Sequence, residues 1–155
     1  MRKPFRQKPL AGTLHFMASR YHKEARPMSL KLLLLVAGAG AVGSTLRYLV
    51  NLAFLRRGTW ELPYATLTVN VLGCFLAGIF YALFADKLHR HAAYAPVLLV
   101  GFLGAFTTFS TFALESANLM QAGAPWKALL NIGLQNLSGL AAVCCGLWLV
   151  RQFCH

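Results

Sequence analysis

Four long apolar stretches, separated by short polar breaks, dominate this sequence of 155 residues. They cover Leu32–Leu55, Leu62–Ala85, Ala92–Leu114 and Ala128–Val150, and Arg47 is the only charged residue inside them. About 20 apolar residues cross the hydrocarbon layer of a bilayer as a helix, so each stretch is long enough to span it. Because the breaks are short, consecutive helices should lie antiparallel. The pattern predicts an all-α membrane protein with four transmembrane helices in one domain.

The composition supports this prediction. Hydrophobic residues make up 57% of the chain and charged residues only 12%, whereas soluble domains carry about a quarter charged residues. The net charge is +11, but seven of the fifteen Lys and Arg residues precede Met28 and the others lie singly or in pairs between the apolar stretches. Juxtamembrane charges are distributed in this way, and a stripe for binding phosphates is not. We therefore expect a lipid environment and no nucleic-acid partner.

Residues 1–27 are basic and contain no sustained apolar run. A signal peptide would place an apolar core before a small-residue cleavage site, and no such core precedes Met28. We interpret this segment as a disordered N-terminal extension, or as sequence upstream of a true start at Met28. A cytoplasmic arm or a targeting segment is the alternative. The four-helix domain then covers residues 28–155.

The charges between the helices favour neither orientation in the membrane. The eight bases after Met28 divide equally between the two sides: Lys31, Lys87, Arg90 and Arg151 on the N-terminal side, and Arg47, Arg56, Arg57 and Lys127 on the other. The positive-inside rule then gives no preference. We expect insertion in both orientations, with oppositely oriented copies paired as an antiparallel, dual-topology homodimer. The seven bases of residues 1–27 would instead fix the N-terminus inside.

No group of residues suggests catalysis or a metal site made of side chains. Cys144 and Cys145 are adjacent and form no C-x-x-C pair, and the histidines lie in the tails or at a helix end. There is no Gly-rich phosphate loop and no acid–base pair. We predict that the protein is not an enzyme and binds no organic cofactor.

Polar residues inside the apolar stretches require a partner or a task, because hydrocarbon offers no hydrogen bonds. The second stretch contains Thr66, Thr68 and Asn70. The Asn70 amide has two uncharged N–H donors, which suit a small anion. Taken alone, however, this residue favours a simpler interpretation, a hydrogen bond between helices.

The third stretch contains an unusual segment, Gly101–Phe112, with two glycines, four hydroxyl residues and four phenylalanines. Glycine and consecutive Thr residues weaken a helix, and hydroxyls can bond the backbone groups that a break releases. Phe109 and Phe112 share a helix face, and the positive edge of a phenyl ring can face an anion. Two interpretations stay open: a helix broken near mid-membrane, or a continuous helix with phenylalanines that face lipid.

The sequence resembles the small fluoride channels of the Fluc or CrcB family. The matching segments are Gly38–Tyr48 (GAGAVGSTLRY), Ala65–Gly73 (ATLTVNVLG) and Gly101–Glu115 (GFLGAFTTFSTFALE), and their order and spacing agree across Leu30–Val150. The resemblance implies a dual-topology homodimer with a broken third helix, two fluoride pathways and a central structural sodium ion. It further implies passive export of toxic fluoride from the cytoplasm across the bacterial inner membrane.

The resemblance also implies roles for single residues. The fluoride pathway corresponds to Asn70, Phe109, Phe112, Ser110 and Thr111. The backbone carbonyls that hold sodium correspond to Gly104 and Thr107, and the vestibule or structural positions correspond to Arg47 and Glu115. In the last helix the family has a Tyr and a Ser one turn apart on a polar track, and the corresponding positions here are Asn131 and Gln135, with Ser138 nearby.

Two other functions are compatible with a small four-helix membrane protein. A proton-coupled multidrug exporter requires a carboxylate within the membrane, typically in the first span, and the only candidate here is Glu115 at the end of the third. A membrane scaffold that transports nothing is the second alternative.

Overall fold

The computed structural model describes residues 29–58 and 62–153, and within this part the chain is helical and contains no strand. Its elements are α2 (Leu30–Leu55), α3 (Tyr64–Ala82), η1 (Leu83–Lys87), η2 (His89–Tyr94), η3 (Val97–Phe102), α4 (Leu103–Phe106), α5 (Phe109–Gln121) and α6 (Pro125–Phe153). Four of the resulting segments are long and apolar enough to cross a membrane: Leu30–Leu55, Tyr64–Ala85, His91–Gln121 and Pro125–Phe153. The predicted four-helix membrane protein is confirmed. The predicted extension, residues 1–27, lies outside the described residues.

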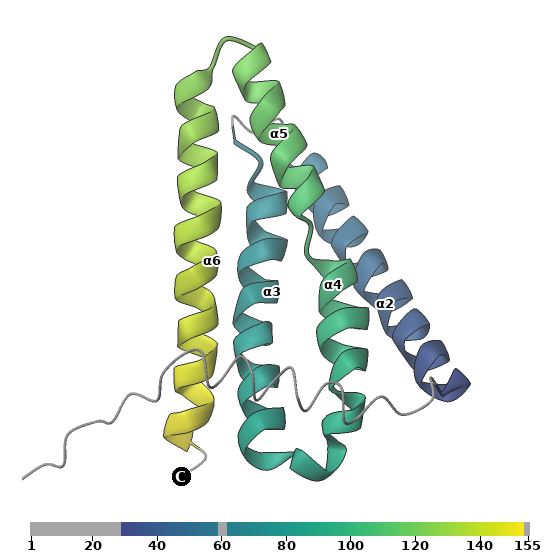
Figure 1. Cartoon of the computed structure of the whole chain (residues 1–155). Coiled ribbons are helices and arrows are strands. Elements are labelled where there is room, and N and C mark those ends of the chain that lie inside the picture. The colour runs from purple at the N-terminus through teal and green to yellow at the C-terminus, as the bar shows by residue number, and fades with distance from the viewer. Residues whose placement is uncertain (1–28, 59–61, 154–155) are drawn as a thin grey trace, which may run out of the picture.

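The helices form a bundle in which neighbours in sequence run antiparallel (Figure 1). Helix α3 lies between α6 and the third span, which consists of η2, η3, α4 and α5. Helix α2 crosses the third span at a steep tilt and packs mainly against η3 and α4. A short turn with Gly123 at φ 74° joins α5 to α6 at one end, and η1 joins α3 to the third span at the other.

Glycines allow the helices to approach to backbone contact. A Cβ atom added to Gly78 of α3 would lie 2.3 Å from the carbonyl oxygen of Val143, and one added to Gly146 of α6 would lie 2.3 Å from that of Phe75. At the crossing of α2 and η3, a Cβ atom on Gly43 would lie 2.3 Å from the carbonyl oxygen of Phe102. Small residues at such positions drive helix packing in lipid, where van der Waals contact replaces the hydrophobic effect. The glycines therefore fix how α3 meets α6 and how α2 meets the third span.

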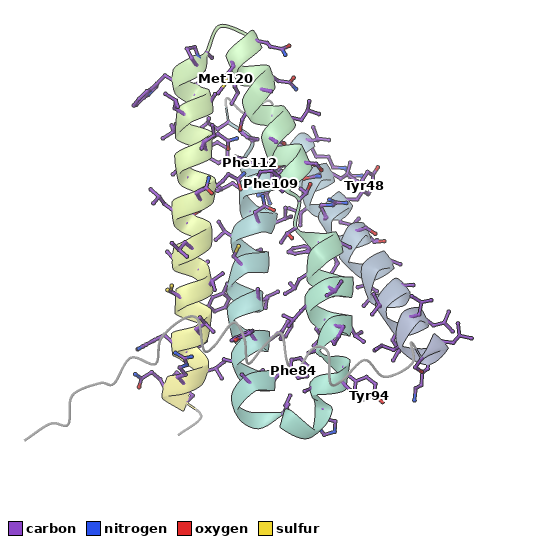
Figure 2. The ribbon with its side chains drawn as sticks, in the orientation of Figure 1. Tyr48, Phe84, Tyr94, Phe109, Phe112 and Met120 are labelled. Carbon is purple, nitrogen blue, oxygen red and sulfur yellow. The ribbon has the colours of Figure 1, made fainter. Side chains whose placement is uncertain are left out.

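The exterior of the bundle is apolar, as a lipid environment requires. Helix α2 is the extreme case, because Gly43 is its only buried residue. Its outer side exposes large side chains such as Val42, Leu49 and Tyr48, and Figure 2 shows Tyr48 pointing away from the bundle. One copy of the chain therefore leaves most of α2 without a protein neighbour.

Candidate functional site

The third span is broken between α4 and α5, where Figure 1 shows a short extended link. Thr107 has φ −82° and ψ 160°, and Thr108 has φ −150° and ψ 113°, so both residues are extended. Thr108 is the N-cap of α5, since its hydroxyl oxygen accepts a hydrogen bond of 3.2 Å from the backbone N–H of Thr111. Of the two interpretations left open by the periodicity, the broken helix is therefore correct.

The side chain of Asn70 on α3 forms hydrogen bonds with the backbone at the break. Its Oδ1 atom accepts a hydrogen bond of 2.9 Å from the backbone N–H of Thr108, and its Nδ2 atom donates one of 3.2 Å to the carbonyl oxygen of the same residue. A single carboxamide thus satisfies both backbone polar groups of Thr108, as a neighbouring strand would. Leaving such groups unpaired away from water costs about 1–3 kcal/mol each, so this contact stabilises the extended link.

The break separates the carbonyl groups of residues 104–107 from their helical hydrogen-bond donors, and the predicted sodium ligands Gly104 and Thr107 are two of these four residues. In a continuous helix, the N–H of Thr108 would donate to the carbonyl oxygen of Gly104, and the N–H of Thr111 to that of Thr107. These N–H groups donate instead to the side chains of Asn70 and Thr108. Gly104 is exposed, and a Cβ atom added there would meet nothing within 4 Å. The carbonyls of Gly104 and Thr107, the predicted sodium ligands, have therefore lost their helical donors, and such neutral oxygens fit a hard cation.

The predicted pair of phenylalanines lies at the start of α5, next to the break (Figure 2). The ring centroids of Phe109 and Phe112 are 5.5 Å apart with an interplanar angle of 62°, which is an edge-to-face arrangement. Phe112 is buried, with 8% of its surface exposed, whereas 78% of Phe109 is exposed. Phe112 therefore lies in the interior of the bundle, and Phe109 lies on the outer surface of the bundle.

Two carboxamides on α6 join this region, one turn apart and both buried. Gln135 accepts a hydrogen bond of 2.9 Å at its Oε1 atom from Nδ2 of Asn70. Asn131 donates one of 2.9 Å to the hydroxyl of Ser116, which in turn donates to the carbonyl oxygen of Phe112. The expected polar track of α6 thus contacts both α3 and α5 through these two residues. Ser138 instead donates to the carbonyl oxygen of Leu134 in its own helix.

A carboxyl group, that of Glu115, lies about one turn after Phe112 on α5 and contacts α3 one turn before Asn70. The hydroxyl of Thr66 donates a hydrogen bond of 2.6 Å to Oε1 of Glu115. The second carboxyl oxygen, Oε2, is buried and has no hydrogen-bond partner in the described part of the chain. Because Thr66 and Asn70 are four residues apart, one face of α3 supplies both contacts to α5 and its cap.

The remaining predicted residues differ in how closely they join the site. The Thr108 hydroxyl donates a hydrogen bond of 2.9 Å to Oγ1 of Thr111, and the exposed Ser110 has its hydroxyl 3.4 Å from the same Thr108 oxygen. Arg47 is half-buried on α2, one turn after Gly43 and on the side that packs against the third span. Within the described residues, none of the hydrogen bonds that link the site includes Arg47.

Three site residues were missed by the sequence analysis as members of the site: Thr66, Thr108 and Ser116. Each has a signal in the sequence. Thr66 lies four residues before Asn70, and Ser116 four after Phe112, so each shares a helix face with a predicted residue. Thr108 precedes Thr111 by three residues, the spacing at which a hydroxyl caps a helix.

Comparisons with known proteins show the family to which the chain belongs. A profile of the family described as CrcB-like protein, Camphor Resistance (CrcB), matches residues 34–147. The chain is 42% identical over 121 residues to a "Fluoride-specific ion channel FluC" of Hydrogenovibrio crunogenus, which covers 78% of this chain and 92% of the relative. A protein of the same name from Aeromonas salmonicida is 46% identical over 120 residues, covering 77% and 95%, respectively.

A third relative of that name, from Saccharophagus degradans, is 45% identical over 109 residues, which are 70% of this chain and 80% of the relative. These relatives are ion channels and not enzymes, which confirms the prediction that the chain has no catalytic function. The matched region contains the whole of the second span and of the broken third span, and most of the first and fourth spans. The chain is a multi-pass membrane protein that belongs to the CrcB-like family of fluoride ion channels.

Proposed function

We propose that this chain forms a passive, fluoride-selective channel. The observation that carries the proposal is the group of uncharged hydrogen-bonding side chains and ring edges beside a helix break, inside an otherwise apolar bundle. Fluoride is small and strongly hydrated, so a dry passage must replace its water contacts with protein donors. Amides, hydroxyls and ring edges supply several modest contacts, whereas a lysine could trap the ion. The relatives, which are named as fluoride-specific ion channels, support fluoride as the permeating ion.

The conducting unit in this proposal is an antiparallel homodimer. Phe109, Ser110 and Gly104 are exposed beside the break in one copy, and Ala41, Val42, Thr45 and Leu46 line a shallow depression on the uncovered side of α2. A second, inverted copy would cover these surfaces and complete two pathways, each formed by both chains. The equal division of the loop charges after Met28 supports insertion in both orientations.

Sodium has a structural role in this proposal. The backbone carbonyls of Gly104 and Thr107 from both copies would hold the ion, which would supply positive charge to oxygens that the break has deprived of N–H donors. The diverted hydrogen bonds of Thr108 and Thr111 support this assignment. Asn70 keeps the link extended, and so keeps both carbonyls available.

We place the channel in the bacterial inner membrane, where it would release fluoride that enters as neutral HF and dissociates in the cytoplasm. Passive efflux down the gradient would then lower its toxicity. A multidrug exporter is disfavoured because α2 contains no acidic residue. Arg47, at the third-span side of α2, would attract anions near the aqueous entrance.

The proposal is tested with purified protein in liposomes loaded with potassium fluoride or potassium chloride. A potassium ionophore starts efflux, and ion-selective electrodes follow each anion. We expect rapid fluoride efflux and chloride efflux no faster than from protein-free liposomes. Equal rates for both anions, or no fluoride efflux, would overturn the proposed function.

A further inference from the structure

One glycine of α3, Gly73, faces the end of α4 directly before the extended link. Gly73 is buried and lies three residues after Asn70, so both residues share the face of α3 that meets the third span. A Cβ atom added to Gly73 would lie 2.2 Å from the Cγ2 methyl carbon of Thr107 and 3.4 Å from the ring of Phe106. The missing side chain of Gly73 therefore makes room for one methyl group of the link.

This contact differs from the other close glycine contacts in the described part of the chain. Four more glycines would bring an added Cβ atom within 3.0 Å of a neighbour, and in each case the nearest atom is a backbone carbonyl oxygen: Gly43, Gly78, Gly101 and Gly146. Those glycines allow two helices to approach. At Gly73 the nearest atom belongs to a side chain at the break, so this glycine acts on the link itself.

Thr107 cannot turn its methyl group away from Gly73 without losing a hydrogen bond. Its hydroxyl donates a hydrogen bond of 2.9 Å to the carbonyl oxygen of Leu103, which also accepts the backbone N–H of Thr107 at 2.9 Å. The hydroxyl and the methyl group are both attached to Cβ, so rotation about χ1 moves them together. The hydroxyl contact with α4 therefore fixes the methyl group against α3.

Asn70 holds the other end of the same peptide group. The N–H of Thr108 donates to Oδ1 of Asn70 at 2.9 Å, and the carbonyl of Thr107 belongs to the peptide that carries this N–H. The described residues contain no cis peptide bond, and in a planar trans peptide the N–H and the carbonyl point in opposite directions. The carbonyl oxygen of Thr107 therefore points away from Asn70.

We propose that Gly73 is a positioning residue of the break, because its missing side chain admits the Thr107 methyl group and so helps Asn70 to fix the direction of the Thr107 carbonyl. This inference rests on the proposed function, in which that carbonyl binds sodium, and adds to it the contact that aims the carbonyl. A Cβ atom at position 73 would push the link away from α3 and lengthen the hydrogen bond between Asn70 and Thr108.

A pair of complementary substitutions separates positioning from simple destabilisation. Gly73→Ala places a methyl group where that of Thr107 lies. Thr107→Ser removes the Thr107 methyl group and keeps the hydroxyl that binds Leu103, so Gly73→Ala combined with Thr107→Ser restores the room. The control is Gly78→Ala, which overlaps a carbonyl oxygen of α6 at 2.3 Å and lowers stability through a contact outside the break.

The break can be observed through a single peptide signal. The sequence contains one pair of consecutive threonines, Thr107 and Thr108. Full-length protein labelled with 13C at threonine carbonyls and with 15N at threonine amides therefore gives one signal from directly bonded 13C and 15N, that of the peptide at the break. In sodium-free buffer, we expect this signal to move in Gly73→Ala and to stay in place in Gly78→Ala. Addition of sodium chloride should shift it in the wild type and in Gly78→Ala, and not in Gly73→Ala.

Stability and transport supply two further readouts. We expect Gly73→Ala to lose the rise in unfolding temperature that sodium chloride gives over N-methylglucamine chloride, and to lose at least tenfold in fluoride efflux. The combined variant should regain most of both. Gly78→Ala should unfold at a lower temperature than the wild type and keep the sodium-dependent rise.

The outcomes distinguish the inference from the function on which it rests. An unmoved break signal in Gly73→Ala overturns the role of Gly73, whatever its efflux. If Gly73→Ala does not fold, recovery of folding, sodium response and efflux in the combined variant supports the inference, and failure to recover them overturns it. An absence of fluoride efflux from the wild type overturns the proposed function. The position of the break signal in sodium-free buffer still decides the role of Gly73 in that case, because it requires neither ion.

Discussion

The carboxamide of Asn70 pairs with both backbone polar groups of Thr108, at 2.9 Å to its N–H and 3.2 Å to its carbonyl oxygen. This contact joins α3 to the one extended link inside the third span. It explains how a polar backbone segment is tolerated in an apolar bundle, since the side chain of a neighbouring helix replaces the missing helical partners. The site depends on this contact, because the carbonyls of Gly104 and Thr107 are released only while the link stays extended.

Replacement of Asn70 should therefore reduce both stability and conduction. Asn70→Leu leaves the two backbone groups of Thr108 and the oxygen of Gln135 without their partner, at about 1–3 kcal/mol for each buried group. We expect a clear fall in the unfolding temperature and a loss of fluoride efflux. Asn70→Asp keeps an acceptor for the Thr108 N–H but places negative charge at the break, so its efflux should also be lost. Asn136→Leu, at an exposed carboxamide, serves as the control, and normal efflux in Asn70→Asp would contradict the role of this residue.

Phe109 and Phe112 should respond differently to the same substitution. Phe109→Ile removes a ring that is 78% exposed in one copy, so its unfolding temperature in detergent should change little while fluoride efflux falls. Phe112→Ile removes a buried ring, and it should lower both efflux and stability, the latter by about 1–3 kcal/mol. Phe153→Ile changes an exposed ring at the far end of α6 and should leave both unchanged. Unimpaired efflux in Phe109→Ile would show that this ring does not line the pathway.

The contact of α3 with α6 should be sensitive to a single added methyl group. A Cβ atom on Gly78 would lie 2.3 Å from a backbone carbonyl oxygen, which cannot move aside as a flexible side chain can. We expect Gly78→Ala to destabilise the bundle by about 1–3 kcal/mol, as overpacking of a tight core does. Gly133→Ala is the matched control, because a Cβ atom on this α6 glycine would meet nothing within 4 Å. Thermal unfolding compares the two, and equal effects would argue against the close approach.

Sodium should stabilise the protein if the carbonyls of Gly104 and Thr107 bind it. Side-chain substitution leaves these oxygens in place, so the ion itself is exchanged. We expect a higher unfolding temperature in sodium chloride than in N-methylglucamine chloride of the same ionic strength, and lower fluoride efflux after sodium has been removed. Asn70→Leu should lose much of the difference, because the released carbonyls depend on the extended link. Identical unfolding in the two salts would exclude a structural sodium ion.

The sequence predicts most of this fold because membrane-spanning segments have a strong and simple signal. The four apolar stretches correspond to the four spans, with ends that differ by a few residues. Periodicity alone does not decide between a broken and a continuous third helix, since Gly and Thr weaken a helix without fixing where it ends. What fixes the position is the carboxamide of Asn70, which comes from a different helix, and that pairing cannot be inferred from local propensity.

The same limit applies to the roles of the carboxamides. Asn70 stands out as a polar residue in an apolar stretch, whereas Asn131 and Gln135 are predicted only from the resemblance to the family. Which of them has a free donor depends on how α3, α5 and α6 are aligned, and this alignment is set by glycine contacts and by the Ser116–Asn131 hydrogen bond. Residue type therefore indicates that a site exists, whereas packing decides which atom of the site can meet an ion.

Dual topology can be tested by the sidedness of tags. We expect a chain that begins at Met28 to place a tag at either terminus on both sides of the membrane in similar amounts, because its eight bases divide equally between the two faces. A chain that begins at Met1 should place both termini inside, because seven further bases precede Met28. Protease accessibility of the tags in intact and in permeabilised cells measures both cases.

Removal of two positive charges from the shorter chain, with Arg56→Gln and Arg57→Gln, should shift it to a single orientation with the N-terminus inside. Fluoride efflux should then fall, because inverted partners would be scarce. A Met28 chain found in only one orientation, yet fully active, would contradict the antiparallel dimer and require another arrangement to cover the exposed face of α2.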